Sequence, residues 1–429
     1  MNIGSDIKNT GIHRPPQMAK NMHSDLDIIY FTLFPWDNAY SSVSLSFTRE
    51  FVKHNRVFYI NHPYTVKDFV KGWKQPMVKA RRGDLLMNRM RYETIPELPE
   101  VIAVQPPLTV PINWMNPGKG YDRWFEFNNR IILNTIKQVI KDYDIKDFVY
   151  LNCFNPYYVG ALPKEFGAKL SMYQCIDDMT EEAYTAKHGA RVEEEAIRNS
   201  DIAFVTSRNL LKMKRHLNPN TYVLHNAVDI TIFEKALEKP LPRPKELENV
   251  KGKIIGFTGN INEYRLNYPL FRQIAERHPD KTLVMVGPLN SDCYKEYGLD
   301  KMPNVILTGG KHIRELPAFL QHFDVAIIPF LKNKLTASIY PLKINEYLAA
   351  GKPVVATNFS EDIRSFADVV YIAENEETFV KSIDRAIAEN SAELIEQRVL
   401  TAKQNTWTER VRQFWEIVDQ HLVGAEKIH

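Results

Sequence analysis

Short apolar runs alternate along this chain with longer segments whose apolar residues recur every three or four positions. Runs rich in Ile, Val, Phe and Tyr predict strands near residues 28–34, 57–60, 101–105, 148–152, 170–174, 202–205 and 221–224. Strands that are apolar throughout are typical of parallel sheets covered by helices on both faces, and their alternation with helical periodicity predicts βα units. The pattern predicts an α/β, doubly wound, Rossmann-like domain over residues 26–233.

A second series of apolar runs predicts a smaller parallel sheet near residues 253–258, 282–286, 305–308, 325–329, 353–356 and 369–372. We expect a second Rossmann-like domain over residues 253–404. Residues 234–252, between the two series, are rich in Lys, Glu and Pro, and this composition predicts an extended linker without a core.

The two ends of the chain differ in character. Residues 1–25 hold a Pro pair among scattered polar residues, which predicts a flexible tail. In residues 405–429, Val411, Phe414, Trp415 and Val418 fall on one face of a predicted helix. We expect this C-terminal helix to pack back on the N-terminal domain.

Two doubly wound domains in tandem predict where ligands bind. The carboxyl ends of parallel strands form the binding crevice in such domains, so two sheets in one chain can face each other across a cleft. This arrangement is typical of an enzyme with two substrates. It does not specify the reaction, because one fold supports many chemistries.

Composition narrows the class of protein. The 429 residues hold 55 Lys and Arg against 52 Asp and Glu, a net charge of +3, which is too small for the basic field that nucleic-acid binding requires. The three cysteines are far apart and fit a reducing compartment better than a disulfide framework. No signal-peptide core and no membrane-spanning apolar run occurs. We therefore expect a cytoplasmic protein that does not bind nucleic acid.

The segment from Ser338 to Thr357, SIYPLKINEYLAAGKPVVAT, carries the most specific signal. Pro341 is suited to the first position of a helix, and Gly351 followed by Pro353 ends it. A short helix with a well-defined start is therefore expected before the next strand.

The start of this predicted helix can bind a diphosphate. N–H groups at a helix start, here around Tyr340, Leu342 and Lys343, lack partners within the helix and attract anions. Lys343 and Glu346, three residues apart, share one face. The lysine can neutralise phosphate charge, and the carboxylate can accept hydrogen bonds from both hydroxyls of a ribose. An ordinary surface pair on an amphipathic helix would show the same spacing.

The phrase PLKINEYLAAGKPVV in this segment resembles the nucleotide-binding motif of glycosyltransferases with the two-Rossmann-domain GT-B fold. The resemblance is to retaining enzymes of family four and to relatives that make teichuronic acid. It implies that Glu346 binds the ribose of a nucleotide diphosphate sugar and that Lys343 lies at the phosphates. It also implies transfer of the sugar to a glycan or lipid-linked acceptor in cell-surface or exopolysaccharide synthesis.

One position departs from the family-four pattern. Those enzymes usually carry a second acidic residue eight positions before the ribose ligand, where it contacts the transferred sugar. This chain has Ser338 there, and the teichuronic-type relatives also have a small residue. We expect Ser338 in the donor site, while the sugar and the stereochemical outcome stay open.

The first strand of the second domain ends in Gly259 and Asn260. Glycine at a strand end lets the backbone approach phosphate oxygens, although a simple tight turn would also use it. The resemblance places the diphosphate loop and a basic residue in this region, and Arg265 is the candidate. The resemblance extends over most of residues 253–390.

Acidic residues that follow strands of the first domain are candidate catalytic groups. Asp37 lies in the loop FPWDNAYSS after the first strand and can act as a general base if configuration is inverted. It would also suit a turn or a helix cap. Asp177 and Asp178 follow a buried strand in YQCIDDMTEE, and similar enzymes carry a comparable pair. These two also suit a strand end followed by a helix cap.

The sequence predicts neither a metal ion nor another cofactor. The D-x-D pairs Asp25/Asp27 and Asp142/Asp144 lie away from the carboxyl ends of the predicted strands, and His and Cys do not cluster. The leaving diphosphate would instead be stabilised by backbone N–H groups, a helix start, and Lys or Arg.

Residues 67–91 form a basic stretch with apolar residues among the charges. Such a segment can lie on an anionic bilayer, which would suit a lipid-linked acceptor. A solvated loop, a plain surface helix or a site for an acidic glycan fits as well. The eight basic residues are Lys67, Lys71, Lys74, Lys79, Arg81, Arg82, Arg89 and Arg91.

Two other functions suit the same predicted fold. A sugar-nucleotide epimerase or hydrolase would need acid and base groups that converge on the donor sugar. A non-catalytic nucleotide-sugar binding subunit would need only the donor site. Turnover with and without an acceptor separates these alternatives from a glycosyltransferase.

Overall fold

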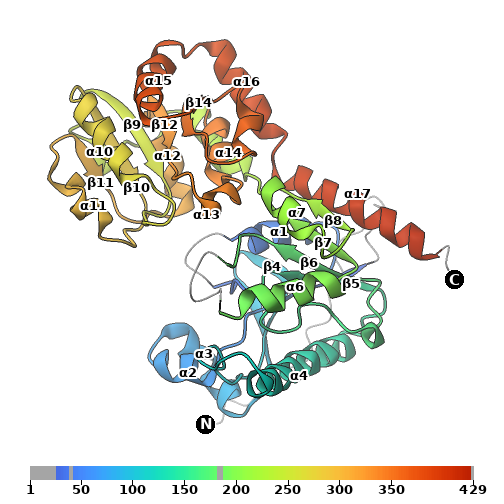
Figure 1. Cartoon of the computed structure of the whole chain (residues 1–429). Coiled ribbons are helices and arrows are strands. Elements are labelled where there is room, and N and C mark those ends of the chain that lie inside the picture. The colour runs from blue at the N-terminus through green and yellow to red at the C-terminus, as the bar shows by residue number, and fades with distance from the viewer. Residues whose placement is uncertain (1–25, 38–41, 181–186, 427–429) are drawn as a thin grey trace, which may run out of the picture.

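The computed structural model describes residues 26–37, 42–180 and 187–426, which form two α/β domains (Figure 1). The tail expected over residues 1–25 lies outside the described residues. Each domain contains one sheet with helices on both faces, so the prediction of two doubly wound parallel-sheet domains is confirmed.

The sheet of the N-terminal domain has eight strands in the order β3-β4-β2-β1-β5-β6-β7-β8. Neighbouring strands are parallel except for β3 and β4, which are antiparallel. The strands are β1 (Asp27–Thr32), β2 (Val57–Ile60), β3 (Arg91–Ile95), β4 (Leu98–Gln105), β5 (Phe148–Cys153), β6 (Leu170–Cys175), β7 (Ile202–Val205) and β8 (Thr221–Val223).

Helices cover both faces of this sheet, and the central strands are buried on both sides. In β1, Ile28 and Tyr30 enter one core cluster while Ile29 and Phe31 enter the other, as the twofold alternation of a strand requires. The helices of this domain are α1 (Val43–Phe51), α2 (Val66–Lys71), α3 (Pro76–Leu86), α4 (Lys119–Asp142), α6 (Gly189–Asn199) and α7 (Arg208–Lys214). The next helix, α8 (Ile230–Phe233), packs in the core of the C-terminal domain.

The C-terminal domain has a parallel sheet of six strands in the order β11-β10-β9-β12-β13-β14. The strands are β9 (Lys253–Thr258), β10 (Lys281–Val286), β11 (Val305–Leu307), β12 (Val325–Ile328), β13 (Val354–Thr357) and β14 (Tyr371–Ala373). The helices are α10 (Tyr268–Arg277), α11 (Cys293–Glu296), α12 (Leu316–His322), α13 (Lys334–Ala337), α14 (Leu342–Ala349), α15 (Glu376–Ala388) and α16 (Ala392–Lys403).

The segment between the two sheets differs from the extended linker that its composition predicts. It contains the short helix α9 (Lys235–Glu238), and its residues Ala236 and Leu247 are buried in the core of the C-terminal domain. The Gln321 side chain also donates hydrogen bonds of 2.9 and 2.8 Å to the carbonyls of Ala236 and Lys239. A few apolar residues in a Pro-rich stretch are thus enough to dock it on the neighbouring domain.

The last helix, α17 (Trp407–Glu426), returns to the N-terminal domain (Figure 1). Its Phe414 ring lies 5.1 Å from the rings of both Phe51 in α1 and Phe204 in β7, and its Trp407 ring lies 5.2 Å from that of Phe47. Aromatic side chains bury large apolar areas, so this cluster fixes the chain end against the first domain.

Candidate active site

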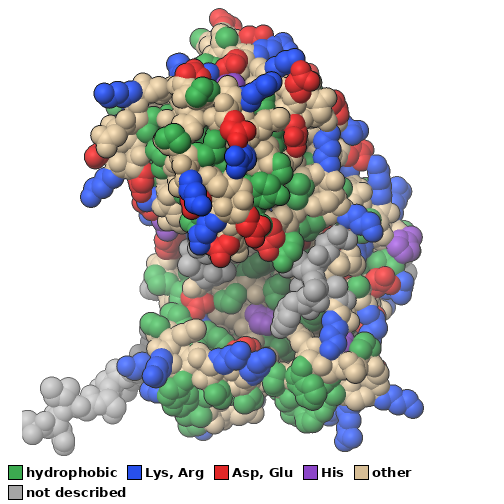
Figure 2. Space-filling model, turned by 60° about the vertical axis from the view of Figure 1, so that its left-hand side comes forward, with side chains coloured by type: hydrophobic (Ala, Val, Ile, Leu, Met, Phe, Trp, Pro, Cys, Tyr) green, Lys and Arg blue, Asp and Glu red, His purple; other side chains and the backbone are tan. Residues whose placement is uncertain are grey.

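The carboxyl edges of the two sheets face each other. Asp177 follows β6 in the first domain, and Arg265 follows β9 in the second. Their side chains form an ion pair, with Nη2 of Arg265 3.4 Å from Oδ2 of Asp177. Figure 2 shows the molecular surface hollowed between the two domains. The candidate site lies where these edges meet.

Helix α14 presents its start to this region. Pro341 is the N-cap, with φ −77° and ψ 104°, so the helix begins at Leu342, one position later than expected. Gly351 follows the helix with φ 66°, a left-handed conformation that favours glycine. Within the helix, the Tyr347 hydroxyl accepts a hydrogen bond of 2.8 Å from the Thr258 N–H at the end of β9. This bond fixes α14 beside the carboxyl edge of the sheet.

Glu346 is a buried and Lys343 a half-buried charged residue of α14. Glu346 is only 7% exposed, and the Lys343 ammonium lies 5.5 and 4.9 Å from the ring centres of Phe257 and Phe330. Burial lowers the pKa of Lys343 and raises that of Glu346, while their mutual attraction acts against both shifts. Neither side chain makes a hydrogen bond or a short ion pair with another described residue, so both remain available to a polar ligand.

The Lys343 side chain packs against Gly259, where a larger residue would clash with it. A Cβ at this position would lie 3.0 Å from Cε and 3.1 Å from Nζ of Lys343, and φ is +136°. The Gly259 N–H donates 2.8 Å to the Val286 carbonyl, so this amide is already used within the protein. The neighbouring Asn260 is exposed and accepts a hydrogen bond of 2.9 Å from Asn290.

Arg265 shares the electrostatic environment of Lys343. Its positive charge contributes to the lowered pKa of that lysine, after burial. The backbone around Arg265 is fixed, because its N–H donates to the Asn262 side chain at 3.2 Å and its carbonyl accepts from the Leu331 N–H at 2.8 Å. Two cations and one buried carboxylate therefore lie at the carboxyl edge of the second sheet.

Ser338 and Tyr340, also predicted at the donor site, contact the N-terminal domain. The Ser338 hydroxyl accepts a hydrogen bond of 2.9 Å from the Asn209 side chain, and Ser338 is 1% exposed. The Tyr340 ring stacks on His225 with centres 4.4 Å apart. Leu342 likewise packs against the core of the first domain. Contact of these three residues with a donor stays a prediction.

The predicted catalytic acids have different surroundings. Asp177 forms the ion pair with Arg265. Asp178 is 4% exposed, and its Oδ1 accepts hydrogen bonds of 3.0 and 2.7 Å from the N–H and hydroxyl of Thr180. Asp37 pairs with Arg81 at 2.8 Å. Asp178 thus stabilises a turn and Asp37 an ion pair, and their catalytic roles stay predictions.

Arg81 differs from what the basic stretch suggested, because it is fully buried. Its guanidinium bonds Asp37 at 2.8 Å and both carboxylate oxygens of Glu93 at 2.7 and 2.5 Å. Two carboxylates inside the fold require such a partner, and the bidentate geometry suits arginine. The sequence pattern gave no sign of this, since Glu93 lies on β3, which was not predicted.

His62 is a further side chain that sequence motifs did not reveal. It follows β2, and its Nδ1 lies 3.2 Å from Nδ2 of Asn155. The same Nδ2 donates to the Thr32 carbonyl, which can only accept, so the amide orientation is fixed and His62 Nδ1 is an acceptor. Burial lowers the His62 pKa to about 4. The neutral ring therefore carries its proton on Nε2, near the carboxyl edge of the first sheet.

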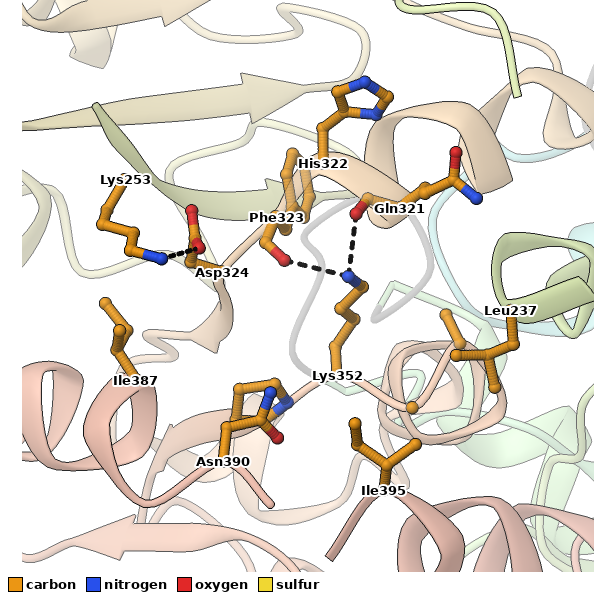
Figure 3. A pocket seen from close by; sticks show the side chains of 13 residues that line it. Leu237, Lys253, Gln321, His322, Phe323, Asp324, Lys352, Ile387, Asn390 and Ile395 are labelled. Atoms are coloured by element: carbon orange, nitrogen blue, oxygen red, sulfur yellow. Dashed lines mark hydrogen bonds and ion pairs between the residues drawn. The ribbon is translucent and has the colours of Figure 1, made fainter. Parts of the chain in front are cut away.

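A cavity of 380 Å³ lies at the opposite edge of the second sheet (Figure 3). Its wall includes Lys253 at the start of β9, which pairs with Asp324 at 2.8 Å. The Lys352 ammonium donates to the carbonyls of Gln321 and Phe323 at 2.9 and 3.0 Å (Figure 3). Lys352 thus caps the end of α12, and the cavity is separate from the candidate active site.

Across the described residues, no three His, Cys, Asp or Glu side chains are grouped as metal ligands would be. None of the described helices is long and apolar enough to cross a bilayer.

Comparison with known proteins identifies the second domain. Residues 252–390 match the family model of glycosyl transferases group 1. A curated relative from Bacillus subtilis (strain 168), the provisionally named teichuronic acid biosynthesis glycosyltransferase TuaH, is 30% identical over 199 residues. That alignment covers 45% of this chain and 49% of TuaH, so the match spans about half of the relative's length.

Solved structures share the architecture of nearly the whole chain. Trehalose 6-phosphate synthase from Burkholderia multivorans aligns with a TM-score of 0.64 at 9% identity, over 93% of this chain and 99% of that one. The E. coli trehalose-6-phosphate protein bound with UDP-2-fluoro glucose gives 0.65 at 10% identity, over 92% and 99%. Sucrose-phosphate synthase from Thermosynechococcus elongatus gives 0.61 at 12% identity, over 93% and 100%. At these identities the likeness shows the fold alone.

The chain therefore has the GT-B fold, and its residues 252–390 form a glycosyl transferases group 1 domain. Both the fold prediction and the family resemblance seen in the α14 segment are confirmed.

Proposed function

We propose that this protein is a glycosyltransferase that moves a sugar from a nucleotide diphosphate donor to a glycan or lipid-linked acceptor. The half-buried Lys343 and the buried Glu346 of α14 carry the proposal. Burying a charge without a short ion pair costs stability, and such groups are typical of functional sites. The match of residues 252–390 to the group 1 family supports the same reaction class.

The C-terminal domain would hold the donor. In this proposal the Glu346 carboxylate accepts hydrogen bonds from the ribose hydroxyls, and Lys343 and Arg265 neutralise the diphosphate. The first N–H groups of α14 add their partial positive charge. The same groups would stabilise the diphosphate as it leaves, since charge that develops during transfer is best met by fixed donors. We expect neither a metal ion nor another cofactor to be required, and turnover in EDTA tests this.

The N-terminal domain would hold the acceptor, near the loops that carry Asp37, Asp177 and Asp178. The name of the relative TuaH supports an acceptor in cell-surface polysaccharide synthesis. A cytoplasmic location belongs to the proposal and is supported by the cysteines, all of which are free.

A peripheral contact with the membrane would bring the enzyme to a lipid-linked acceptor. Helices α2 and α3 and the turn between them expose apolar residues beside basic ones, with Val70 64%, Trp73 40% and Leu86 62% exposed. Figure 2 shows apolar and Lys or Arg side chains together at the end of the N-terminal domain far from the second domain. Each basic group near an anionic surface contributes about 1 kcal/mol. The exposed lysines are Lys67, Lys71, Lys74 and Lys79.

Flotation with lipid vesicles tests the membrane contact. We expect the protein to bind vesicles that contain phosphatidylglycerol and not vesicles of phosphatidylcholine alone. Reversing Lys67, Lys71 and Lys74 to Glu should abolish binding, whereas reversing Lys295, Lys301 and Lys381, three exposed lysines of the second domain, should not. Equal binding of both variants would contradict the contact.

Turnover assays separate the proposed function from its alternatives. The purified protein is incubated with UDP-, GDP-, CDP- and ADP-sugars, with and without acceptor glycans or a membrane lipid extract, in the presence of EDTA. A glycosyltransferase forms product only with an acceptor. An epimerase or hydrolase converts the donor alone, and a binding subunit shows saturable binding without conversion.

A further inference from the structure

The ion pair between Asp177 and Arg265 joins the two halves of the candidate site. Asp177 comes from the acceptor domain and Arg265 from the donor domain, and their side chains are 32% and 33% exposed. The pair is therefore solvated enough to exchange partners, unlike the buried pair of Lys214 and Glu193, whose side chains are 6% and 0% exposed.

Arg265 also belongs to the group of charges proposed to bind the donor. Its charge acts on Lys343 strongly enough to contribute to the lowered pKa of that lysine. Two cations that repel each other in this way are stabilised when an anion lies between them. A diphosphate, which carries more than one negative charge, would attract both.

A carboxylate and a phosphate oxygen compete for the same guanidinium N–H groups, because both accept charge-assisted hydrogen bonds from arginine. We propose that Asp177 is a competing counter-ion for Arg265, which the diphosphate of the donor replaces on binding. The inference rests on the proposed function and adds a regulation of donor affinity by the acceptor domain. Asp177 lowers donor affinity, and donor binding releases its carboxylate from Arg265.

Other contacts between the domains do not include Arg265. Lys212 of α7 pairs with Glu361 at 2.5 Å, with side chains 66% and 41% exposed. The Arg208 N–H donates 3.0 Å to Oδ2 of Asp362. The Lys212–Glu361 pair links the same two domains through an exposed carboxylate that does not contact Arg265, so Glu361→Gln is a matched control for Asp177→Asn.

Calorimetry at low salt tests the exchange with the nucleoside diphosphate that binds most tightly among UDP, GDP, CDP and ADP. Asp177→Asn and Asp177→Ala should each lower Kd by about two- to fivefold, as expected for loss of a solvated competing pair. Glu361→Gln should leave Kd unchanged. In an Arg265→Gln background, Asp177→Asn should bring no further gain, since the shared partner is gone.

The outcomes distinguish a failure of this inference from a failure of the proposed function on which it rests. An unchanged Kd in both Asp177 variants would overturn the competition, and a higher Kd would show that Asp177 holds the ligand instead. A gain of equal size in the Arg265→Gln background would also overturn it. If the proposed function itself is wrong, the result differs. Either the wild-type protein binds no nucleoside diphosphate, or the Glu346→Ala variant binds one as tightly as the wild type does.

Discussion

Lys343 and Glu346 lie one turn apart on the same face of α14, and burial moves their pKa values toward each other, down for the lysine and up for the glutamate. Burial disfavours the charged form of both side chains, and a polar ligand that contacts both would stabilise those charged forms. This relationship makes the start of α14 the centre of the proposed donor site.

Nucleotide binding should weaken as pH rises through the lowered pKa of Lys343. An ammonium is needed to neutralise a diphosphate. Burial lowers the pKa of Lys343 from its ordinary value of 10.5, so the ammonium loses its proton at a lower pH. Between pH 7.5 and 10 we expect Kd to rise for the wild-type protein and to stay flat for Lys343→Met, which should bind more weakly at pH 7.5. Calorimetry across this range measures both.

The stability of the nucleotide-free protein should increase over the pH range in which nucleotide binding weakens. Because the folded-state pKa of Lys343 is lowered, the unfolded chain binds more protons between the two pKa values, so the contribution of this group to stability rises with pH there. In urea unfolding, Lys343→Met should have the higher free energy of unfolding at low pH. This advantage over the wild type should narrow or reverse as pH increases. A difference independent of pH would contradict the burial of this charge.

Gly259→Ala should impair the donor site by displacing Lys343. The added Cβ would lie 3.0 Å from the lysine Cε, at a backbone φ of +136° that L-residues rarely adopt. We expect a loss of about 1–3 kcal/mol in stability from backbone strain and a weaker affinity for the nucleoside diphosphate. Gly83→Ala, in helix α3, where a Cβ meets nothing within 4 Å, is the control. It should leave the nucleotide affinity unchanged and raise the stability by up to about 1 kcal/mol, because alanine favours a helix interior over glycine.

Arg81→Met should destabilise the N-terminal domain strongly. The substitution leaves Asp37 and Glu93, whose side chains are 9% and 10% exposed, without their common partner. Breaking a buried ion pair on one side costs about 3–5 kcal/mol. Urea denaturation measures the loss, and the triple variant Arg81→Met, Asp37→Asn, Glu93→Gln should recover part of it. A loss below 1 kcal/mol would contradict the buried network.

Parallel strands were predictable because both of their faces are buried. In β5 and β6 every residue is buried, so both sequences are mostly apolar, and their polar residues are Asn152, Ser171 and Gln174. Strand β3 was missed, because it is an antiparallel edge strand whose sequence, RYETI, is half-exposed and polar. The start of α14 was misplaced by one residue, since Pro341 fits both the N-cap and the first helical position.

The candidate site was predictable only where its residues are contiguous. Lys343 and Glu346 lie in one motif, and a helical spacing places them together. The Asn209–Ser338 hydrogen bond and the Asp177–Arg265 pair join residues 129 and 88 positions apart, and no local pattern reports such contacts. Arg81 looked like one of several surface cations until the fold brought Glu93 beside it.

The central claim is that Glu346 binds a nucleoside diphosphate at the start of α14. Titration calorimetry of wild type and Glu346→Ala with UDP, GDP, CDP and ADP in EDTA tests it most directly. We predict saturable binding of at least one nucleotide by the wild type and a loss of about 1–3 kcal/mol in the variant, because a pair of charge-assisted hydrogen bonds is removed. Equal affinity in a folded variant would contradict the account.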